Sequence, residues 1–207
     1  WFTEGHKPNS INRNGGYASR FNMTVTRFQL LNECMRLRPP PTSDADKADS
    51  WHMLRSFIDG FNKRRKRAVT PGQTLVVDES MSAFRQKASG DFNVDGMPHL
   101  VKIARKPEGV GAEFKSLADA DTGILLFLEL QEGRDAMRAK EMCAELGAGA
   151  ACTYRMTKPW HGSGRTIIAD SWFGSFKCAV ALMMVGLYCA MMVKTAYRCF
   201  PLAFLKA

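Results

Sequence analysis

Two aspartates, Asp78 and Asp170, follow apolar runs of the kind that form buried strands. Asp78 comes directly after residues 75–77 (Leu-Val-Val), and Asp170 directly after residues 166–169 (Thr-Ile-Ile-Ala). Such runs are typical of strands inside a sheet, so each carboxylate is expected at the mouth of the sheet. If the two strands are neighbours, the carboxylates face one cleft. They then offer the hard oxygen ligands that Mg²⁺ or Mn²⁺ prefers when it assists phosphoryl transfer.

The sequence around Asp170 leaves two interpretations open. Asp170 is the only acidic residue after Glu145, in a segment that otherwise carries basic residues. An unpaired acid beside an apolar strand is costly unless a metal or a cation satisfies it, which favours a ligand role. The alternative is a cap of the helix that follows, with Ser171 or Gly174 nearby. Periodicity alone does not decide between ligand and cap.

Size and charge limit the class of protein. With 207 residues, of which 45% are hydrophobic, the chain can form one good core and a small accessory segment, and it is not a disordered protein. The formal net charge is +9. Residues 1–70 carry 13 Lys+Arg against 6 Asp+Glu, and residues 71–207 carry 16 against 14. The basic excess therefore belongs mostly to the N-terminal part.

The sequence indicates neither a membrane protein nor a secreted one. Residues 178–193 are uncharged, but they number only 16, and Gly186 interrupts them. A transmembrane helix needs about 20 residues, so this segment is predicted to be a buried helix followed by a buried strand. The six cysteines show no C-x-x-C spacing and are expected to be reduced core residues. The chain starts at Trp1, so we expect it to be a piece of a longer protein.

The predicted elements supply the surroundings that the two aspartates need. Two amphipathic helices come first, one from Thr24 to the prolines at 39–41 and one after the acidic lead at 43–46. The strand before Asp78 is then followed by an antiparallel hairpin, residues 112–118 and 124–132. The order is completed by a helix over 135–146, a shorter helix up to residue 159, the strand before Asp170, a helix over 174–185 and a strand over 187–193.

This order predicts a mixed α/β fold with a ribonuclease H-like core. Three antiparallel strands followed by helix, strand, helix and strand is the order of that fold, in which the first and fourth strands lie side by side. Asp78 is expected to end the first strand and Asp170 the fourth. We therefore divide the chain into a helical, basic N-terminal segment, residues 1–70, and a core, residues 71–207, that is incomplete at its C-terminus.

Five consecutive basic residues directly precede the turn that begins the first strand: Lys63, Arg64, Arg65, Lys66 and Arg67. Such a run can contact nucleic-acid phosphates or serve as a nuclear localisation signal. Alternatively it is the solvated end of a helix, where cations are favoured by the helix dipole. Five in a row is more than a helix end needs, which favours phosphate contact.

Several of these segments together resemble the piggyBac transposase-derived family. The matching motifs are Thr-Pro-Gly-Gln at 70–73, Val-Asp-Glu-Ser-Met at 77–81, Lys-Pro at 106–107, Asp-Thr-Gly at 121–123 and Asp-Ser-Trp-Phe-Gly-Ser at 170–175. The resemblance covers roughly residues 21–201. It implies a ribonuclease H-like catalytic domain that cuts and joins DNA. It also implies DNA as the partner, no membrane, nuclear localisation and a homodimer of the intact protein.

The resemblance implies that Asp78 and Asp170 are the first two acids of a three-aspartate site for Mg²⁺ or Mn²⁺. Glu79, on the opposite face of its strand, is expected to have a supporting role. The family's third acid lies on a helix after the last strand, and no Asp or Glu follows Asp170 here. We therefore expect a fragment or a decayed copy that binds the metal weakly if at all and is inactive alone, whereas its intact parent performs metal-dependent DNA strand cleavage and transfer. The alternative is a non-catalytic DNA-binding remnant that uses residues 63–67.

Overall fold

The computed structural model describes residues 23–34, 39, 41–83, 101–102, 110–196, 200 and 202–205. The Lys-Pro motif at 106–107 lies outside these residues. The chain forms two compact units, residues 1–39 and residues 40–207. The first unit contains helix α2 (Val25–Cys34). The side chain of Thr24 accepts a hydrogen bond from the backbone N of Arg27 at 3.2 Å, so the predicted helix start at Thr24 is confirmed.

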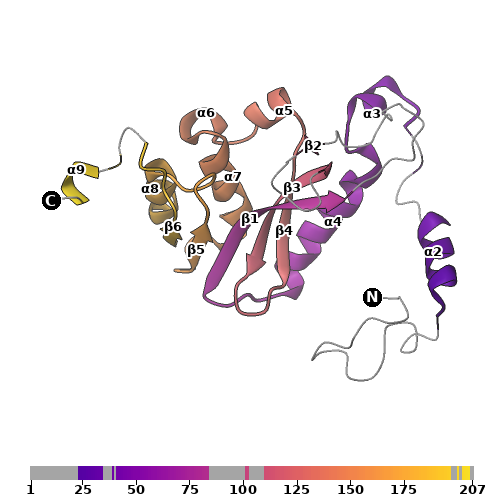
Figure 1. Ribbon diagram of the computed structural model, residues 1–207, viewed down its shortest axis with the longest axis horizontal. Coiled ribbons are helices and arrows are strands. Elements are labelled where there is room, and N and C mark those ends of the chain that lie inside the picture. The colour runs from indigo at the N-terminus through magenta and orange to yellow at the C-terminus, as the bar shows by residue number, and fades with distance from the viewer. Residues whose placement is uncertain are drawn as a thin grey trace. The chain divides into compact units, whose positions relative to one another are not determined.

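The second unit combines a mixed sheet with helices on both of its faces (Figure 1). The described strands are β1 (Thr74–Ala83), β2 (Val101–Lys102), β3 (Val110–Asp119), β4 (Leu125–Leu130), β5 (Thr166–Ala169) and β6 (Tyr188–Met191). The described helices are α3 (Asp44–Ala48), α4 (His52–Ala68), α5 (Arg134–Arg138), α6 (Cys143–Leu146), α7 (Ala148–Thr157), α8 (Phe176–Met184) and α9 (Leu202–Leu205), with a 3₁₀ turn, η1 (Lys158–Trp160), after α7.

The described strands form one sheet with the order β2-β3-β1-β5-β6, and β4 also pairs with β3. β1 is antiparallel to β3, and β3 is antiparallel to β4, which confirms the predicted hairpin. β1 is parallel to β5, and β5 is parallel to β6. The first and fourth strands of the predicted core are therefore neighbours. The prediction of a mixed α/β fold with a ribonuclease H-like strand order is confirmed.

One face of the sheet packs against α7 and α8 (Figure 1). Leu75 and Val77 of β1 point to this face because side chains alternate along a strand. They are buried together with Ile167 of β5, Met156 of α7 and Leu182 of α8. Burial of this many large apolar side chains in one cluster supplies most of the driving force for folding of the unit.

Helix α4 packs on the other face, over β3 and β4 (Figure 1). The indole Nε1 of Trp51, at the start of α4, donates to the backbone O of Gln131 at 2.8 Å. The side chain of Asn62 pairs with both backbone groups of Leu128 in the edge strand β4, at 2.8 and 2.9 Å. α4 thus belongs to the same packing unit as the sheet. That unit extends further toward the N-terminus than the core expected from residue 71.

Two predicted helices are each divided into two. The helix expected after residues 43–46 becomes α3 and α4, because the side chain of Asp49 accepts the backbone N–H of Trp51 at 2.9 Å and starts a new helix there. The helix expected over residues 135–146 becomes α5 and α6. Met142, between them, has φ 63°, in the left-handed region that a right-handed helix cannot contain.

A chain of ion pairs ties α4 to β4 and to the segment after α5. Arg55 lies between Asp49 (2.6 Å) and Glu132 (2.5 Å), and Lys140 lies 2.7 Å from Glu132. The hydrogen bond from Arg55 lowers the pKa of Asp49. Burial alone would raise the pKa of Glu132, but the hydrogen bonds from Lys140 and Arg55 outweigh it and lower this pKa. Both carboxylates therefore stabilise the fold above about pH 4, and this stabilisation is lost as the pH falls through the lowered pKa values.

No helix in the described ranges has the length and apolar character needed to cross a membrane. Residues 178–193 form most of α8 and all of β6, which confirms a helix followed by a strand. The predicted burial of the strand is wrong, because the residues of β6 are exposed or half-buried. The described cysteines are all free thiols: Cys34, Cys143, Cys152, Cys178 and Cys189. Burial raises the pKa of Cys152, and it raises the pKa of Cys178 to about 12, so both are protonated core residues at neutral pH.

Candidate functional site

Strands β1 and β5 bring Asp78 and Asp170 to the same part of the sheet. The two strands are parallel and in register up to the pair Val77 and Ala169, so each aspartate follows the last paired residue. Val77 and Ala169 are buried in the core on the α7–α8 side. Because successive side chains of a strand point to opposite faces, Asp78, which lies within β1, points to the other face. Asp170 directly follows the adjoining strand β5, as the predicted topology requires; the role of both as metal ligands stays a prediction.

The prediction that Asp78 ends its strand is wrong. β1 continues to Ala83, because β3 goes on pairing with it as far as the partners Ala83 and Gly111. Asp78 therefore lies within β1, opposite Ser116 of β3. The Ser116 hydroxyl donates to the backbone O of Asp78 at 3.0 Å. The strand is thus fixed on its β3 side, while on its other side β5 ends one residue before Asp170.

The Asp78 side chain is exposed, and its Oδ1 accepts a hydrogen bond from the backbone N of Glu79 at 2.8 Å. Glu79 is partly buried, and its Cα partner across the β1–β3 pair is Lys115. By strand alternation Glu79 points to the α7–α8 face, away from the Asp78 carboxylate. This placement agrees with a supporting role for Glu79 rather than a ligand role.

Asp170 begins a tight turn between β5 and α8. Its Oδ1 accepts the backbone N–H of Trp172 at 2.8 Å, and its backbone O accepts the N–H of Gly174 at 2.8 Å. The residue that caps α8 is Ser175, whose hydroxyl accepts from the backbone N of Cys178 at 3.1 Å. The helix-cap interpretation of Asp170 is therefore wrong, because its side chain closes its own turn and the cap is Ser175, five residues later.

Two glycines fit this turn against its neighbours. A Cβ on Gly174 would lie 2.3 Å from the backbone O of Met192. A Cβ on Gly149, in α7, would lie 2.1 Å from the backbone O of Trp172. Neither contact leaves room for a side chain, so the turn takes this position only because both residues are glycine. The backbone that carries Asp170 is thus packed from two sides.

The sheet face to which Asp78 points has exposed side chains over β5 and β6. Its apolar side chains Ile168, Tyr188 and Met192 are 41%, 66% and 70% exposed. Helix α4 covers the β3–β4 part of the same face. A ligand that approaches Asp78 from this side therefore meets an open surface of the described residues.

The two carboxylates form a partial ligand set for a divalent ion. The described residues contain no cluster of three or more His, Cys, Asp or Glu side chains that could hold a metal. Mg²⁺ is nevertheless commonly bound by one or two carboxylates together with water and substrate phosphates. The carboxylates of Asp78 and Asp170 are hard oxygen donors, and this chemistry fits Mg²⁺ or Mn²⁺.

The basic run forms the last turns of α4, where cations are favoured by the helix dipole. Consecutive residues of a helix point in different directions, so the run does not form a single patch. Arg65 is half-buried and lies 5.1 Å from the centroid of the Phe61 ring, whereas the other four basic residues are exposed. A surface groove of about 420 Å³ is lined by Gly60, Lys63, Arg64, Arg67 and Ala68. Phosphate contact stays a prediction, and the candidate residues are now the three cations that line this groove, Lys63, Arg64 and Arg67.

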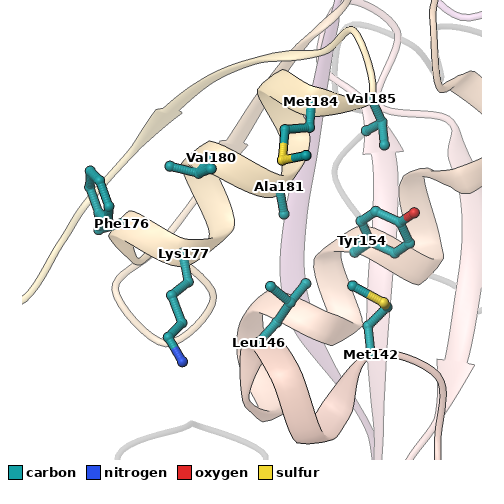
Figure 2. Close-up of a pocket in the computed structure, with 9 residues that line it drawn as sticks. All are labelled: Met142, Leu146, Tyr154, Phe176, Lys177, Val180, Ala181, Met184 and Val185. Atoms are coloured by element: carbon teal, nitrogen blue, oxygen red, sulfur yellow. The ribbon is translucent and has the colours of Figure 1, made fainter.

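A second groove lies between α6, α7 and α8 (Figure 2). Its volume is about 340 Å³. It is lined by Met142, Leu146, Tyr154, Phe176, Lys177, Val180, Ala181, Met184 and Val185. The Nζ of Lys177 donates to the backbone O of Glu145 at 3.1 Å. Apart from Lys177 and Tyr154 the lining residues are apolar, so this groove offers no ligand set for a metal.

Sequence analysis missed Lys115 and Trp172, which lie next to the site. Lys115 is 4% exposed, and its Nζ is 3.9 Å from the centroid of the Trp172 ring. A signal was present in the hairpin strand. Lys115 is two residues from the buried Leu117 and so points to the same face, and a lysine on a buried face is unusual unless it is paired. The contact itself joins residues far apart in the sequence and could not be read from either segment.

Comparison with known proteins adds independent findings. The model of a family described as Transposase IS4 matches residues 13–207. A piggyBac transposase synaptic complex with hairpin DNA has a TM-score of 0.69 and 25% sequence identity, over 89% of this chain and 36% of that chain. A Mos1 transposase paired-end complex with the left transposon end and a Mos1 mariner paired-end complex with Mn both have TM-scores of 0.28, at 13% and 12% identity, over 95% and 90% of this chain and 62% and 61% of theirs. No curated protein matches the chain.

Proposed function

Because this chain belongs to the family described as Transposase IS4 and is a piggyBac-like transposase domain, we propose that it is part of a catalytic domain that cuts and joins DNA with divalent metal ions. One observation carries this proposal. Asp78 and Asp170 directly follow the last paired residues, Val77 and Ala169, of two adjoining parallel strands. The chain spans 36% of the length of the piggyBac transposase chain it resembles.

In this proposal Asp78 and Asp170 hold a Mg²⁺ or Mn²⁺ ion. When bound, the ion activates the attacking water or 3′-hydroxyl and stabilises the leaving oxygen of the DNA strand. The task of the chain is to hold the two carboxylates in place: one oxygen of each accepts a backbone N–H, from Glu79 and from Trp172. Since two carboxylates give few anionic ligands, we expect the 207-residue chain by itself to bind the ion weakly and to be inactive.

Replacement of Asp78 or Asp170 by asparagine is expected to weaken Mn²⁺ binding by about tenfold or more, because asparagine keeps the shape but loses the charge that holds the ion. The dissociation constant is measured from the electron paramagnetic resonance signal of free Mn²⁺. The matched control is Asp121→Asn. Asp121 is an exposed acid in the β3–β4 turn, and it lies next to Gly72, which precedes the first residue of β1. This variant should bind Mn²⁺ as the wild type does.

Nicking of supercoiled DNA in the presence of Mn²⁺ is the second readout, and because the chain is expected to be inactive alone, neither the wild type nor the variants should nick. Unchanged Mn²⁺ affinity in both asparagine variants would contradict the metal role. So would any nicking by the chain that survives Asp78→Ala.

A second candidate function is non-catalytic DNA binding through the basic groove of α4. Lys63, Arg64 and Arg67 are exposed around one groove, which is the arrangement expected of a phosphate-binding surface. The basic run at residues 63–67, which contains these three cations, is also our proposed nuclear localisation signal. This candidate does not require the aspartates, so the two functions can be tested separately.

Replacing Lys63, Arg64 and Arg67 together by glutamine is expected to weaken binding to duplex DNA. It should also reduce the slope of log affinity against log salt concentration by about 2–3, because about one counterion fewer is released on binding for each phosphate contact that is lost. Fluorescence anisotropy of a labelled duplex between low and moderate salt measures both quantities. Arg134→Gln with Arg138→Gln on α5 is the control of similar charge. If the triple variant keeps the wild-type slope, this groove is not the DNA contact.

A further inference from the structure

Lys115 is a buried cation in the centre of the sheet. It lies in β3, on the same face of the sheet as Leu117, and is 4% exposed. Its Nζ donates to Oε1 of Glu113 at 2.5 Å, and its Cα partner in β1 is Glu79, the neighbour of Asp78. A buried ammonium is costly unless the groups around it compensate for lost water. The surroundings of Nζ therefore show which contacts the fold maintains.

Trp172 provides the nearer of two aromatic contacts with this ammonium. Nζ of Lys115 lies 3.9 Å from the centroid of the Trp172 ring and 5.6 Å from that of Phe173. A cation over an indole face is attracted by the ring quadrupole, and the attraction is stronger where water is excluded. Phe173 is fully buried, but Trp172 is 39% exposed. Core packing thus fixes Phe173, whereas the half-exposed indole depends more on the ammonium beneath it.

Trp172 is also the residue that orients Asp170. Its backbone N donates to Asp170 Oδ1 at 2.8 Å. Movement of Trp172 therefore moves the hydrogen bond that directs the carboxylate. Gly149 packs against the backbone O of the same residue, so the turn is held from α7 through the backbone and from β3 through the ring.

We propose that Lys115 is a positioning residue for the Asp170 carboxylate. From the α7–α8 face of the sheet, its ammonium fixes the Trp172 ring, and through the Trp172 backbone N–H it fixes the direction of Asp170. This assignment rests on the proposed metal-binding function of Asp78 and Asp170. It gives the hairpin strand β3, which carries neither aspartate, a role in the geometry of the site.

The test removes the ammonium without leaving a buried carboxylate unpaired. Lys115→Met with Glu113→Gln removes both charges at similar volume, and Trp172→Leu removes the ring. Each is expected to raise the Mn²⁺ dissociation constant by about tenfold, the usual effect of losing a supporting contact of a metal ligand. Combined, they should cost little more than either alone, because they break the same contact. Lys115→Arg, which keeps a cation against the indole, should stay near the wild-type value.

A second measurement does not involve metal. Hydrogen exchange of the Trp172 backbone amide, followed by nuclear magnetic resonance, reports its hydrogen bond to Asp170. In the Lys115→Met/Glu113→Gln variant this amide is expected to exchange about tenfold faster, while the amide of Gly123 in the β3–β4 turn should be unchanged. The control is Lys140→Met with Glu132→Gln, which removes a partly buried ion pair (2.7 Å) away from the turn and should change neither readout.

The outcomes separate the two proposals. If Asp78→Asn leaves Mn²⁺ binding unchanged, the proposed function fails; the exchange of the Trp172 amide then still decides whether Lys115 orients the turn. If the aspartate variants lose Mn²⁺ but the Lys115 and Trp172 variants bind it as the wild type does, the positioning role is overturned and the metal site stands. An equal effect of the Lys140 control would also overturn it, because the loss would then reflect general destabilisation.

Discussion

Replacement of Arg155 by methionine is expected to lower the free energy of unfolding by about 3–5 kcal/mol, the usual cost of removing one partner of a buried ion pair. Arg155 of α7 holds Glu129 of β4 with two hydrogen bonds, Nε to Oε2 at 2.9 Å and Nη2 to Oε1 at 2.6 Å. The two side chains are 11% and 8% exposed. Methionine keeps the apolar stem but leaves the Glu129 carboxylate buried, and Lys140, 3.8 Å away, compensates only in part.

The double variant Arg155→Met with Glu129→Leu is the control. Removing both charges removes the uncompensated carboxylate, so most of the lost stability should return. Urea unfolding followed by circular dichroism measures the three free energies under one condition. A single Arg155→Met variant that loses less than about 1 kcal/mol would show that this pair behaves like a solvated surface ion pair, contrary to its burial.

The sheet order could be predicted because hydrophobic period and turn residues are local signals. The apolar run before Asp78 and the hairpin around residues 121–123 each fix an element within a few residues. The order of those elements leaves few topologies for a sheet of mixed direction, and the ribonuclease H-like one makes β1 and β5 neighbours. The placement of Asp78 and Asp170 on adjoining strands followed from that order without any knowledge of side-chain contacts.

The helix boundaries could not be predicted because tertiary contacts set them. Asp49 ends one helix and begins another by accepting the Trp51 N–H, and its carboxylate is held there by Arg55. Met142 adopts a left-handed backbone conformation that no local signal indicates. The extension of β1 past Asp78 has the same origin, since it depends on pairing with β3 about 30 residues later in the chain.

The acidic residues of the candidate site could be predicted from the sequence, but the contacts that hold them in place could not. Two acids after apolar runs indicate oxygen ligands at a sheet edge, and the structure places both directly after the last paired residues of adjoining parallel strands. The contact of Lys115 with Trp172 joins a hairpin strand to a turn far along the chain. No periodicity links these two residues, because each has a sufficient local explanation, one as a strand residue and the other as a turn residue.

Replacement of Phe173 by alanine is expected to lower the free energy of unfolding by about 3–5 kcal/mol, from lost apolar burial and the cavity that remains. Phe173 is fully buried in the core between the sheet, α7 and α8. Its ring also meets the Trp172 ring edge to face at a centroid distance of 4.6 Å. For a domain whose total stability is about 5–15 kcal/mol this is a large fraction, so thermal unfolding should show the loss directly.

Phe173→Leu separates the two roles of the ring. Leucine fills most of the cavity, so it should cost clearly less stability than alanine. It removes the aromatic edge next to Trp172 just as alanine does, however, and Trp172 carries the N–H that orients Asp170. Mn²⁺ affinity measured on the folded Phe173→Leu protein should therefore fall although the fold persists. Wild-type affinity in this variant would mean that the Asp170 turn is held by Gly149, Gly174 and Lys115 without help from the aromatic pair.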